Sequence, residues 1–214
     1  MRIPMWRAVA MVAAMTAGAA GIAAARDPIV GDARIPYSAV RTVTVDGKIY
    51  RGKVFHVPGK ERHDEDVSGI ELDFILDLDG AEGFIVVPGL HSYVSARLPP
   101  ILAELDRNRL KGMAAGEERV AGLRATKYRL DYTASDGVHG EGFIWVGDDN
   151  ILLKVEGRVD RAKHKPLNIR MELSEIRPGP QDAALFKPPE GMKRIPEEAL
   201  QMLLNLNLKL PGQK

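Results

Sequence analysis

Strict alternation of apolar and polar residues is the feature that most restricts how this chain folds. In the stretch 70–78 an apolar residue stands at every second position from Ile70 to Leu78, and most residues between are acidic. Successive side chains of a β-strand point to opposite faces of a sheet, so this pattern predicts a half-buried strand. Full or weaker alternation predicts further strands at 37–45, 48–57, 82–88, 91–98, 128–132, 139–147, 151–156 and 167–174.

Short turn sequences separate these strands. Asp46-Gly47 lies between two alternating runs and favours a two-residue hairpin turn. Similar signals occur at Asp79-Gly80, Pro88-Gly89-Leu90, Asp136-Gly137 and Asp148-Asp149-Asn150. None leaves room for a crossover helix, so we expect antiparallel neighbours in one long meander and a single all-β domain.

Two segments have helical spacing. Residues 101–111 follow Pro99-Pro100, and a second predicted helix begins at Pro196 and runs to about residue 206. Nine strands offer an apolar face of roughly 800 Å², whereas a three-turn helix covers roughly 180 Å². Two helices leave more apolar surface than a soluble monomer exposes. The sequence therefore predicts a mainly β fold, a curved antiparallel sheet (half-barrel) with about two covering helices. An internal pocket and a closed, filled barrel both satisfy this estimate.

The first 25 residues have the order of a secretory signal peptide. Two arginines precede an uncharged run at 8–22, and Ala23 and Ala25 occupy the small-residue positions before Arg26. The run is shorter than the roughly 20 residues of a bilayer span. We expect cleavage before Arg26, a periplasmic location and a mature protein that is not an integral membrane protein. The predicted parts are a signal peptide at 1–25, a domain at 26–195 and a C-terminal segment at 196–214.

Composition narrows the function classes. The chain has 30 Lys and Arg against 29 Asp and Glu, and without Arg2 and Arg7 the balance is 28 against 29. A near-neutral chain with intermixed signs gives no electrostatic reason to expect a nucleic-acid partner. Cysteine is absent, so we expect no lipid anchor on a lipobox Cys, no disulfide and no thiolate chemistry.

Several stretches together resemble the LolA/LolB-like superfamily of outer-membrane lipoprotein-sorting proteins. They are Leu76-Asp77-Leu78-Asp79-Gly80, Gly83-Phe84-Ile85-Val86-Val87-Pro88 with Tyr93, Val120-Ala121-Gly122, Thr126-Lys127-Tyr128-Arg129, Gly142-Phe143-Ile144-Trp145-Val146, Ile151-Leu152-Leu153-Lys154, and the ending at 180–191. The resemblance covers most of 37–192 and is greatest to small periplasmic members without an assigned ligand. It implies an antiparallel half-barrel that holds acyl chains. The mature chain does not open with an amphipathic helix as the lipoprotein carriers do, and no functional residue is carried over from them.

Candidate site residues follow from the apolar face. Because an apolar cavity is the usual binding site of such a fold, the residues predicted to face a ligand are Phe74, Tyr128, Tyr132, Phe143, Trp145, Leu153, Met171 and Leu203. Each of the aromatic residues taken singly is more often core than ligand contact. The run His63-Asp64-Glu65-Asp66 offers metal-binding residue types, but adjacency alone favours a solvated turn, so no metal is predicted.

The sequence contains no nucleophile elbow, P-loop or paired metal-binding histidines, so we expect no enzyme and no cofactor. The predicted function is a periplasmic binding or carrier protein for a lipid, a lipoprotein acyl chain or another apolar ligand. The alternative is an envelope structural or interaction protein without a small-molecule ligand. Residues 196–214 are predicted to form either a lid over the open side of the half-barrel or a docked helix that completes the core.

Overall fold

The described part of the chain is a single curved sheet of twelve strands. The computed structural model describes residues 32–67, 69–78, 82–97, 111–133, 139–160, 165–200 and 202. The strands are β1 (Tyr37–Val45), β2 (Lys48–Val57), β3 (Lys60–Val67), β4 (Ile70–Asp77), β5 (Glu82–Val87), β6 (Ser92–Arg97), β7 (Lys111–Val120), β8 (Leu123–Thr133), β9 (His139–Gly147), β10 (Leu152–Asp160), β11 (Leu167–Pro178) and β12 (Lys193–Arg194). Three short 3-10 turns complete the elements: η1 (Pro88–Leu90), η2 (Asp148–Asn150) and η3 (Ala183–Phe186).

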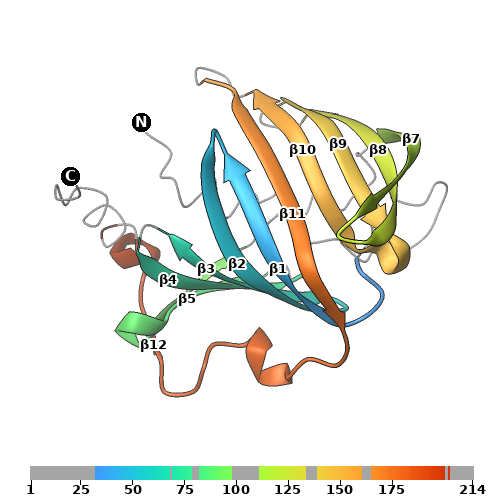
Figure 1. Ribbon diagram of the computed structural model, residues 1–214. Coiled ribbons are helices and arrows are strands. Elements are labelled where there is room, and N and C mark those ends of the chain that lie inside the picture. Colours follow the sequence, from blue (N-terminus) through green and yellow to red (C-terminus); the bar gives the residue numbers. More distant parts are fainter. Residues whose placement is uncertain are drawn as a thin grey trace.

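The strand order is β12-β6-β5-β4-β3-β2-β1-β11-β10-β9-β8-β7. All neighbours pair antiparallel except β12, which runs parallel to β6. The expected single meander is therefore wrong in one respect: two meanders, β1 to β6 and β7 to β11, meet where β1 pairs with β11. Figure 1 shows the resulting curvature, with β7 to β11 on one side of β1 and β3 to β5 crossing at a steep angle on the other.

Alternation in the sequence sets the two faces of this sheet. Directly paired residues share a face, and one row runs through Ala39, Val54, His63, Phe74, Ile85 and Val94. A parallel row runs through Tyr50, Val43, Met171, Val155, Ile144 and Tyr128. We call the face that carries these rows the inner face and the opposite one the outer face.

Two of the three hydrophobic clusters formed by the described residues include the inner face. The larger spans β1, β2 and β7 to β11, and the second joins β4, β5 and β6 to Leu200. The third cluster lies on the outer face, where Phe186 of η3 packs against Ile75 and Val86. At least one end of the inner face is thus covered by the segment that follows β12, since Leu200 is only 1% exposed.

Two covering helices are not part of the described fold. The predicted helix at 101–111 lies outside the described residues except for Lys111, which begins β7 rather than ending a helix. Of the predicted C-terminal helix, residues 197–200 and 202 are helical, Pro196 is not, and residues 201 and 203–206 lie outside the described residues. No helix in the described ranges has the length and hydropathy that a membrane span requires.

Candidate binding face

The inner face brings together three of the eight predicted site residues, Phe74, Tyr128 and Met171. Phe74 lies in the β4–β6 cluster, and Met171 is fully buried in the larger cluster. Leu153 is also fully buried, but it lies at the β-bulge between Leu152 and Lys154, against Gly147 of β9. Tyr128 is half-buried at the far end of its row, opposite Ile144. The side chain of Tyr132 in β8 and the whole of Leu203 lie outside the described residues.

Phe143 and Trp145 lie on the outer face, so they do not share a surface with the inner-face residues. Trp145 pairs in the ladder with Lys127 on one side and Lys154 on the other. The ammonium groups of these lysines lie 4.8 Å and 4.2 Å from the centre of the Trp145 ring. Its indole N–H donates to Glu118 Oε2 at 2.8 Å. Cation–π contacts and this hydrogen bond account for a tryptophan that is only 1% exposed on a charged face.

A buried ion pair interrupts the inner face between its two apolar clusters. Arg41 of β1 donates through Nη2 to Oε1 of Glu65 in β3, and both side chains are 0–1% exposed. Gly52 of β2 lies opposite both residues in the ladder. A Cβ at Gly52 would overlap the Asp64 carbonyl oxygen and crowd Glu65 Cγ, so only glycine lets Arg41 and Glu65 meet across β2.

Further ionisable groups surround this pair. His63 Nε2 lies 3.3 Å from Glu61 Oε2, and both side chains are buried. Burial, together with the charge of Arg41, holds the pKa of His63 well below its usual value, so this histidine is neutral at pH 7. Burial also lowers the pKa of Arg41 to about 10, although the negative charge of Glu61 opposes that shift.

Tyr37 and His56 extend this group of polar residues towards the N-terminal end of β1. Their rings stack with centroids 5.0 Å apart, and His56 Nε2 lies 3.0 Å from the carbonyl oxygen of Ala33. Burial is the main cause of the lowered pKa of His56. Burial, followed by the charges of Glu61 and Asp32, raises the pKa of Tyr37. We refer to Asp32, Tyr37, Arg41, His56, Glu61, His63 and Glu65 as the inner polar cluster.

The prediction of a solvated turn at 63–66 is wrong. These residues lie in β3, where Glu61, His63 and Glu65 point to the buried inner face and Asp64 to the outer face. The sequence signal that places 63–66 in a strand is the turn sequence Pro58-Gly59 just before it, where Gly59 has a φ of 81°. Eight residues of strand then separate it from the turn before Ile70. No group of three or more His, Asp or Glu in the described residues has the geometry to hold a metal ion.

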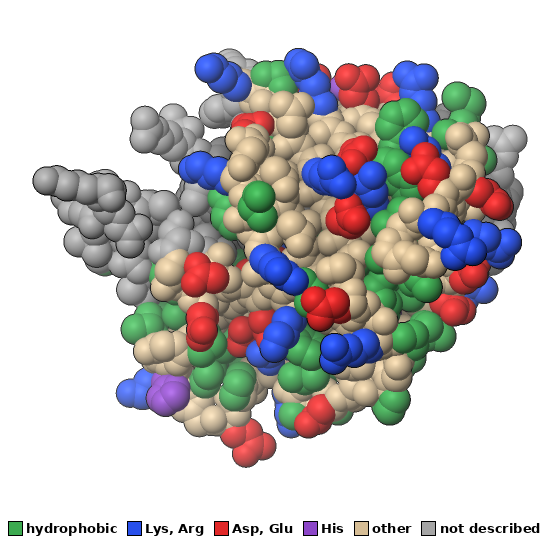
Figure 2. All heavy atoms as spheres, viewed as in Figure 1, with side chains coloured by type: hydrophobic (Ala, Val, Ile, Leu, Met, Phe, Trp, Pro, Cys, Tyr) green, Lys and Arg blue, Asp and Glu red, His purple; other side chains and the backbone are tan. Residues whose placement is uncertain are grey.

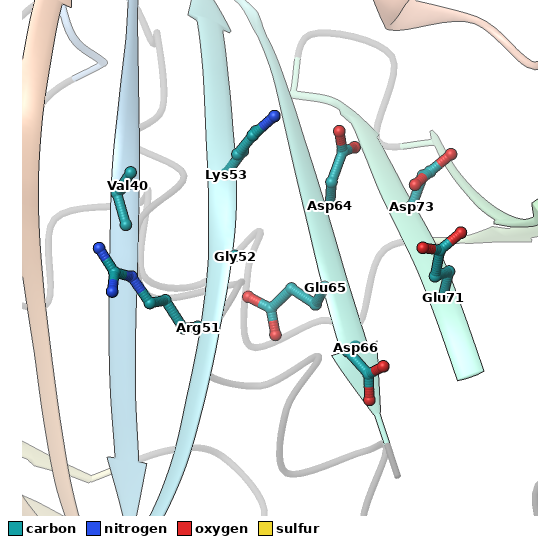
Figure 3. A pocket seen from close by; sticks show the side chains of 9 residues that line it. All are labelled: Val40, Arg51, Gly52, Lys53, Asp64, Glu65, Asp66, Glu71 and Asp73. Atoms are coloured by element: carbon teal, nitrogen blue, oxygen red, sulfur yellow. The ribbon is translucent and has the colours of Figure 1, made fainter. Parts of the chain in front are cut away.

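The outer face carries a hollow of about 450 Å³ over β1 to β4. Its lining is charged on both sides, as Figure 3 shows: Arg51 and Lys53 extend from β2, and Asp64, Asp66, Glu71 and Asp73 from β3 and β4. Acidic and basic side chains also intermingle over the face seen in Figure 2, where no large single-sign patch stands out.

Like charges face each other across the β3–β4 ladder in this hollow. Asp64 is directly opposite Asp73, and Arg62 bridges them at 2.5 Å and 2.9 Å. Burial, with the charge of Asp64, raises the pKa of Asp73 to about 6, against the effect of Arg62. The sequence pattern placed Asp73 correctly on the polar face of its strand, but it did not indicate that Asp64 lies opposite or that Arg62 bridges the two carboxylates.

The described fold is therefore an open, strongly curved, mostly antiparallel sheet whose inner face is apolar around a buried ionic cluster. No protein-family model matches the chain, and no curated protein matches it. The chain is similar in structure to an uncharacterized conserved protein from Thermus thermophilus, with a TM-score of 0.51, 14% identity, and coverage of 76% of this chain and 90% of that one. At this identity the likeness concerns the fold alone.

Two further solved structures are more distant. A LolA superfamily protein from Nitrosomonas europaea has a TM-score of 0.37 and 9% identity, with 72% of this chain and 90% of that chain covered. The MucA/MucB complex of Pseudomonas aeruginosa has a TM-score of 0.39 and 16% identity, with 72% of this chain and 56% of that chain covered.

Proposed function

We propose that this protein binds or carries an apolar ligand, a lipid or a lipoprotein acyl chain, in the cell envelope. The observation that carries the proposal is the inner face, which is apolar from β8 to β6 apart from the inner polar cluster. A concave, mostly apolar lining with a few polar groups is the usual form of a small-molecule site. The signal-peptide pattern at 1–25 supports export, and the likeness of fold to a LolA superfamily protein is consistent with an envelope role.

Half-buried aromatic residues on neighbouring strands offer a matched test of which face binds. Tyr128 of β8 lies on the inner face and Phe143 of β9 on the outer face, and both are partly buried against the larger cluster. Binding of a solvatochromic apolar dye is titrated for the mature protein and for Tyr128→Ser and Phe143→Ser. We expect Tyr128→Ser to weaken binding about tenfold, which is roughly 1.4 kcal/mol of lost apolar contact, and Phe143→Ser to leave it unchanged.

Two results would contradict this proposal. Equal weakening by both variants would mean that the dye reports general loosening, and an effect of Phe143→Ser alone would move the site to the outer face. Circular dichroism and melting of each variant establish that the comparison is made between folded proteins. Native mass spectrometry of protein purified from its own envelope then supplies the natural ligand, and a co-purifying acyl species is the expected result.

The alternative function is an envelope interaction protein without a small-molecule ligand. The observation that favours it is the outer hollow, whose two walls carry opposite charges. Charges of both signs at a surface steer and orient a protein partner more than they strengthen its binding. A stoichiometric protein in the same mass spectra, with no acyl species, supports this alternative over the carrier function.

A further inference from the structure

Arg41 has hydrogen-bond donors left over inside the inner face. Its guanidinium is fully buried, and among the described residues only Nη2 of its three nitrogens has a partner, the Oε1 atom of Glu65. Nε and Nη1 reach no acceptor, and Oε2 of Glu65 reaches no donor, in the part of the chain that the structure describes. Buried charged groups normally satisfy such atoms, because water is not there to replace the missing partner.

These atoms sit at the junction of the two inner-face clusters. Arg41 is paired with Leu173 on the β11 side, in the larger cluster. Glu65 is paired with Leu72 on the β4 side, in the second cluster. If an acyl chain lies along the inner face, its polar linkage can therefore lie next to the open donors of Arg41 and the open acceptor of Glu65.

The charge balance decides which linkage fits. The carboxylates of Glu61 and Glu65 both act on Arg41, and neighbouring His63 is neutral, so the surroundings of Arg41 hold more negative than positive charge. An anionic head group is repelled by these carboxylates. A cationic head group finds the Glu65 acceptor but is repelled by Arg41 and leaves its open donors unfilled. A neutral group with one acceptor and one donor satisfies both residues without adding charge.

We infer that the inner face selects acyl ligands with a neutral, amide-like linkage, whose carbonyl accepts from Arg41 and whose N–H donates to Glu65. This inference rests on the proposed function and adds the chemical class of its ligand. The acyl tail lies on the apolar clusters, as proposed above, and the linkage lies at the Arg41–Glu65 pair. Free fatty acids and alkylammonium ions of the same chain length are poorer ligands.

Three amphiphiles that differ only in head-group charge test the inference: dodecanamide, dodecanoate and dodecylammonium. Each displaces the apolar dye from the mature protein at pH 7, below the concentration at which micelles form. We expect dodecanamide to bind at least tenfold more tightly than either ion. Equal affinities, or tighter binding of either ion, would overturn the inference while leaving apolar binding intact. Dye that binds but is displaced by none of the three also overturns it, whereas absence of dye binding defeats the proposed function itself.

A variant pair links the selectivity to Glu65. Glu65→Gln keeps an oxygen acceptor for Arg41 and removes one negative charge, so dodecanoate should gain at least tenfold relative to dodecanamide. Glu71→Gln removes the same charge from the outer face of β4 and should leave the ranking unchanged. An identical shift in both variants would assign the effect to net charge and refute the role of Glu65. If Glu65→Gln fails to fold, the ranking of the three amphiphiles in the unaltered protein decides the inference alone.

Discussion

The Arg41–Glu65 pair allows a direct test of how the inner polar cluster contributes to stability. Both side chains are 0–1% exposed, and each is the other's hydrogen-bond partner. Removing one member of a buried ion pair typically costs about 3–5 kcal/mol, because the remaining charge has lost its compensation. Replacing both members with apolar residues of similar volume is often neutral or stabilising.

The charges around Arg41 and Glu65 decide where each single variant falls within the range of about 3–5 kcal/mol of lost unfolding free energy. In Glu65→Leu the charge of Glu61 still acts on Arg41, so we expect a loss of about 3 kcal/mol, near the lower end. In Arg41→Met two carboxylates, Glu61 and Glu65, lose their counter-charge, so we expect about 5 kcal/mol. The double variant keeps only Glu61 uncompensated by Arg41 and should be more stable than Arg41→Met.

Urea unfolding measures this thermodynamic cycle. Trp145 is the only tryptophan beyond the predicted signal peptide and is buried, so its fluorescence reports unfolding of the mature protein. With a slope of about 2–3 kcal/mol per molar urea, a loss of about 3 kcal/mol moves the midpoint by roughly 1–1.5 M. Strictly additive losses, with a coupling energy near zero, would refute the reasoning, because they would mean that the two charges do not compensate each other.

Two further predictions concern pH and the C-terminal segment. The lowered pKa values of His56 and His63 mean that, below about pH 6.5, the unfolded chain binds protons that the folded one does not, so unfolding free energy should fall by up to about 1.4 kcal/mol per pH unit for each histidine. Asp73, whose pKa is raised to about 6, acts in the opposite direction between pH 6 and 4, because the folded chain then binds a proton that the unfolded chain does not. Asp73→Asn should therefore make the fall in stability from pH 7 to pH 5, measured in thermal melts, steeper. Stability that does not change over this pH range would contradict both expectations. Deleting residues 196–214 removes buried Leu200 from the β4–β6 cluster, and we expect a cooperative melt at lower temperature with tighter dye binding, whereas a chain that cannot fold would make the segment part of the core.

The strands with ordinary alternation were predictable. β1, β2 and β9 begin and end where the pattern places them, and β4 differs by one residue at its end. In β1 every second residue from Tyr37 to Val43 is buried, and the Asp46-Gly47 turn joins it to β2. In these strands one face packs on the core and the other faces solvent, so the alternation of apolar and polar residues in the sequence is enough to predict the strand and its faces.

Three strands, β3, β7 and the two-residue β12, were not predicted, and for β3 and β7 the reasons are opposite. β3 alternates in burial but not in polarity, because its inward positions are Glu61, His63 and Glu65. β7 is an edge strand of the sheet, and its residues 113–119 are all exposed, so its sequence does not alternate between apolar and polar residues. An edge strand and a strand with buried charges both lack the contrast on which pattern reading depends.

The candidate site was only partly within reach of sequence reasoning. Phe74 and Met171 were placed on the inner face because their strands alternate, whereas a β-bulge between Leu152 and Lys154 breaks the alternation at Leu153. Trp145 was assigned to the wrong surface, since an aromatic residue covered by Lys127 and Lys154 reads as apolar core in a linear pattern. No linear signal identifies the partner of Arg41, which lies 24 residues away in a strand that was not predicted.

The sequence by itself determined that this chain forms antiparallel β-structure with one apolar and one polar face, because side-chain alternation and short turns are local properties. Only the tertiary structure decided that β1 pairs with β11, which joins two meanders into one sheet. The pairings of β1 with β2 and of β2 with β3 set Arg41 against Glu65 across Gly52. The reason is physical: strand neighbours, and the compensation of buried charges, depend on contacts between residues far apart in the chain, and these exist only after the backbone has closed its ladders.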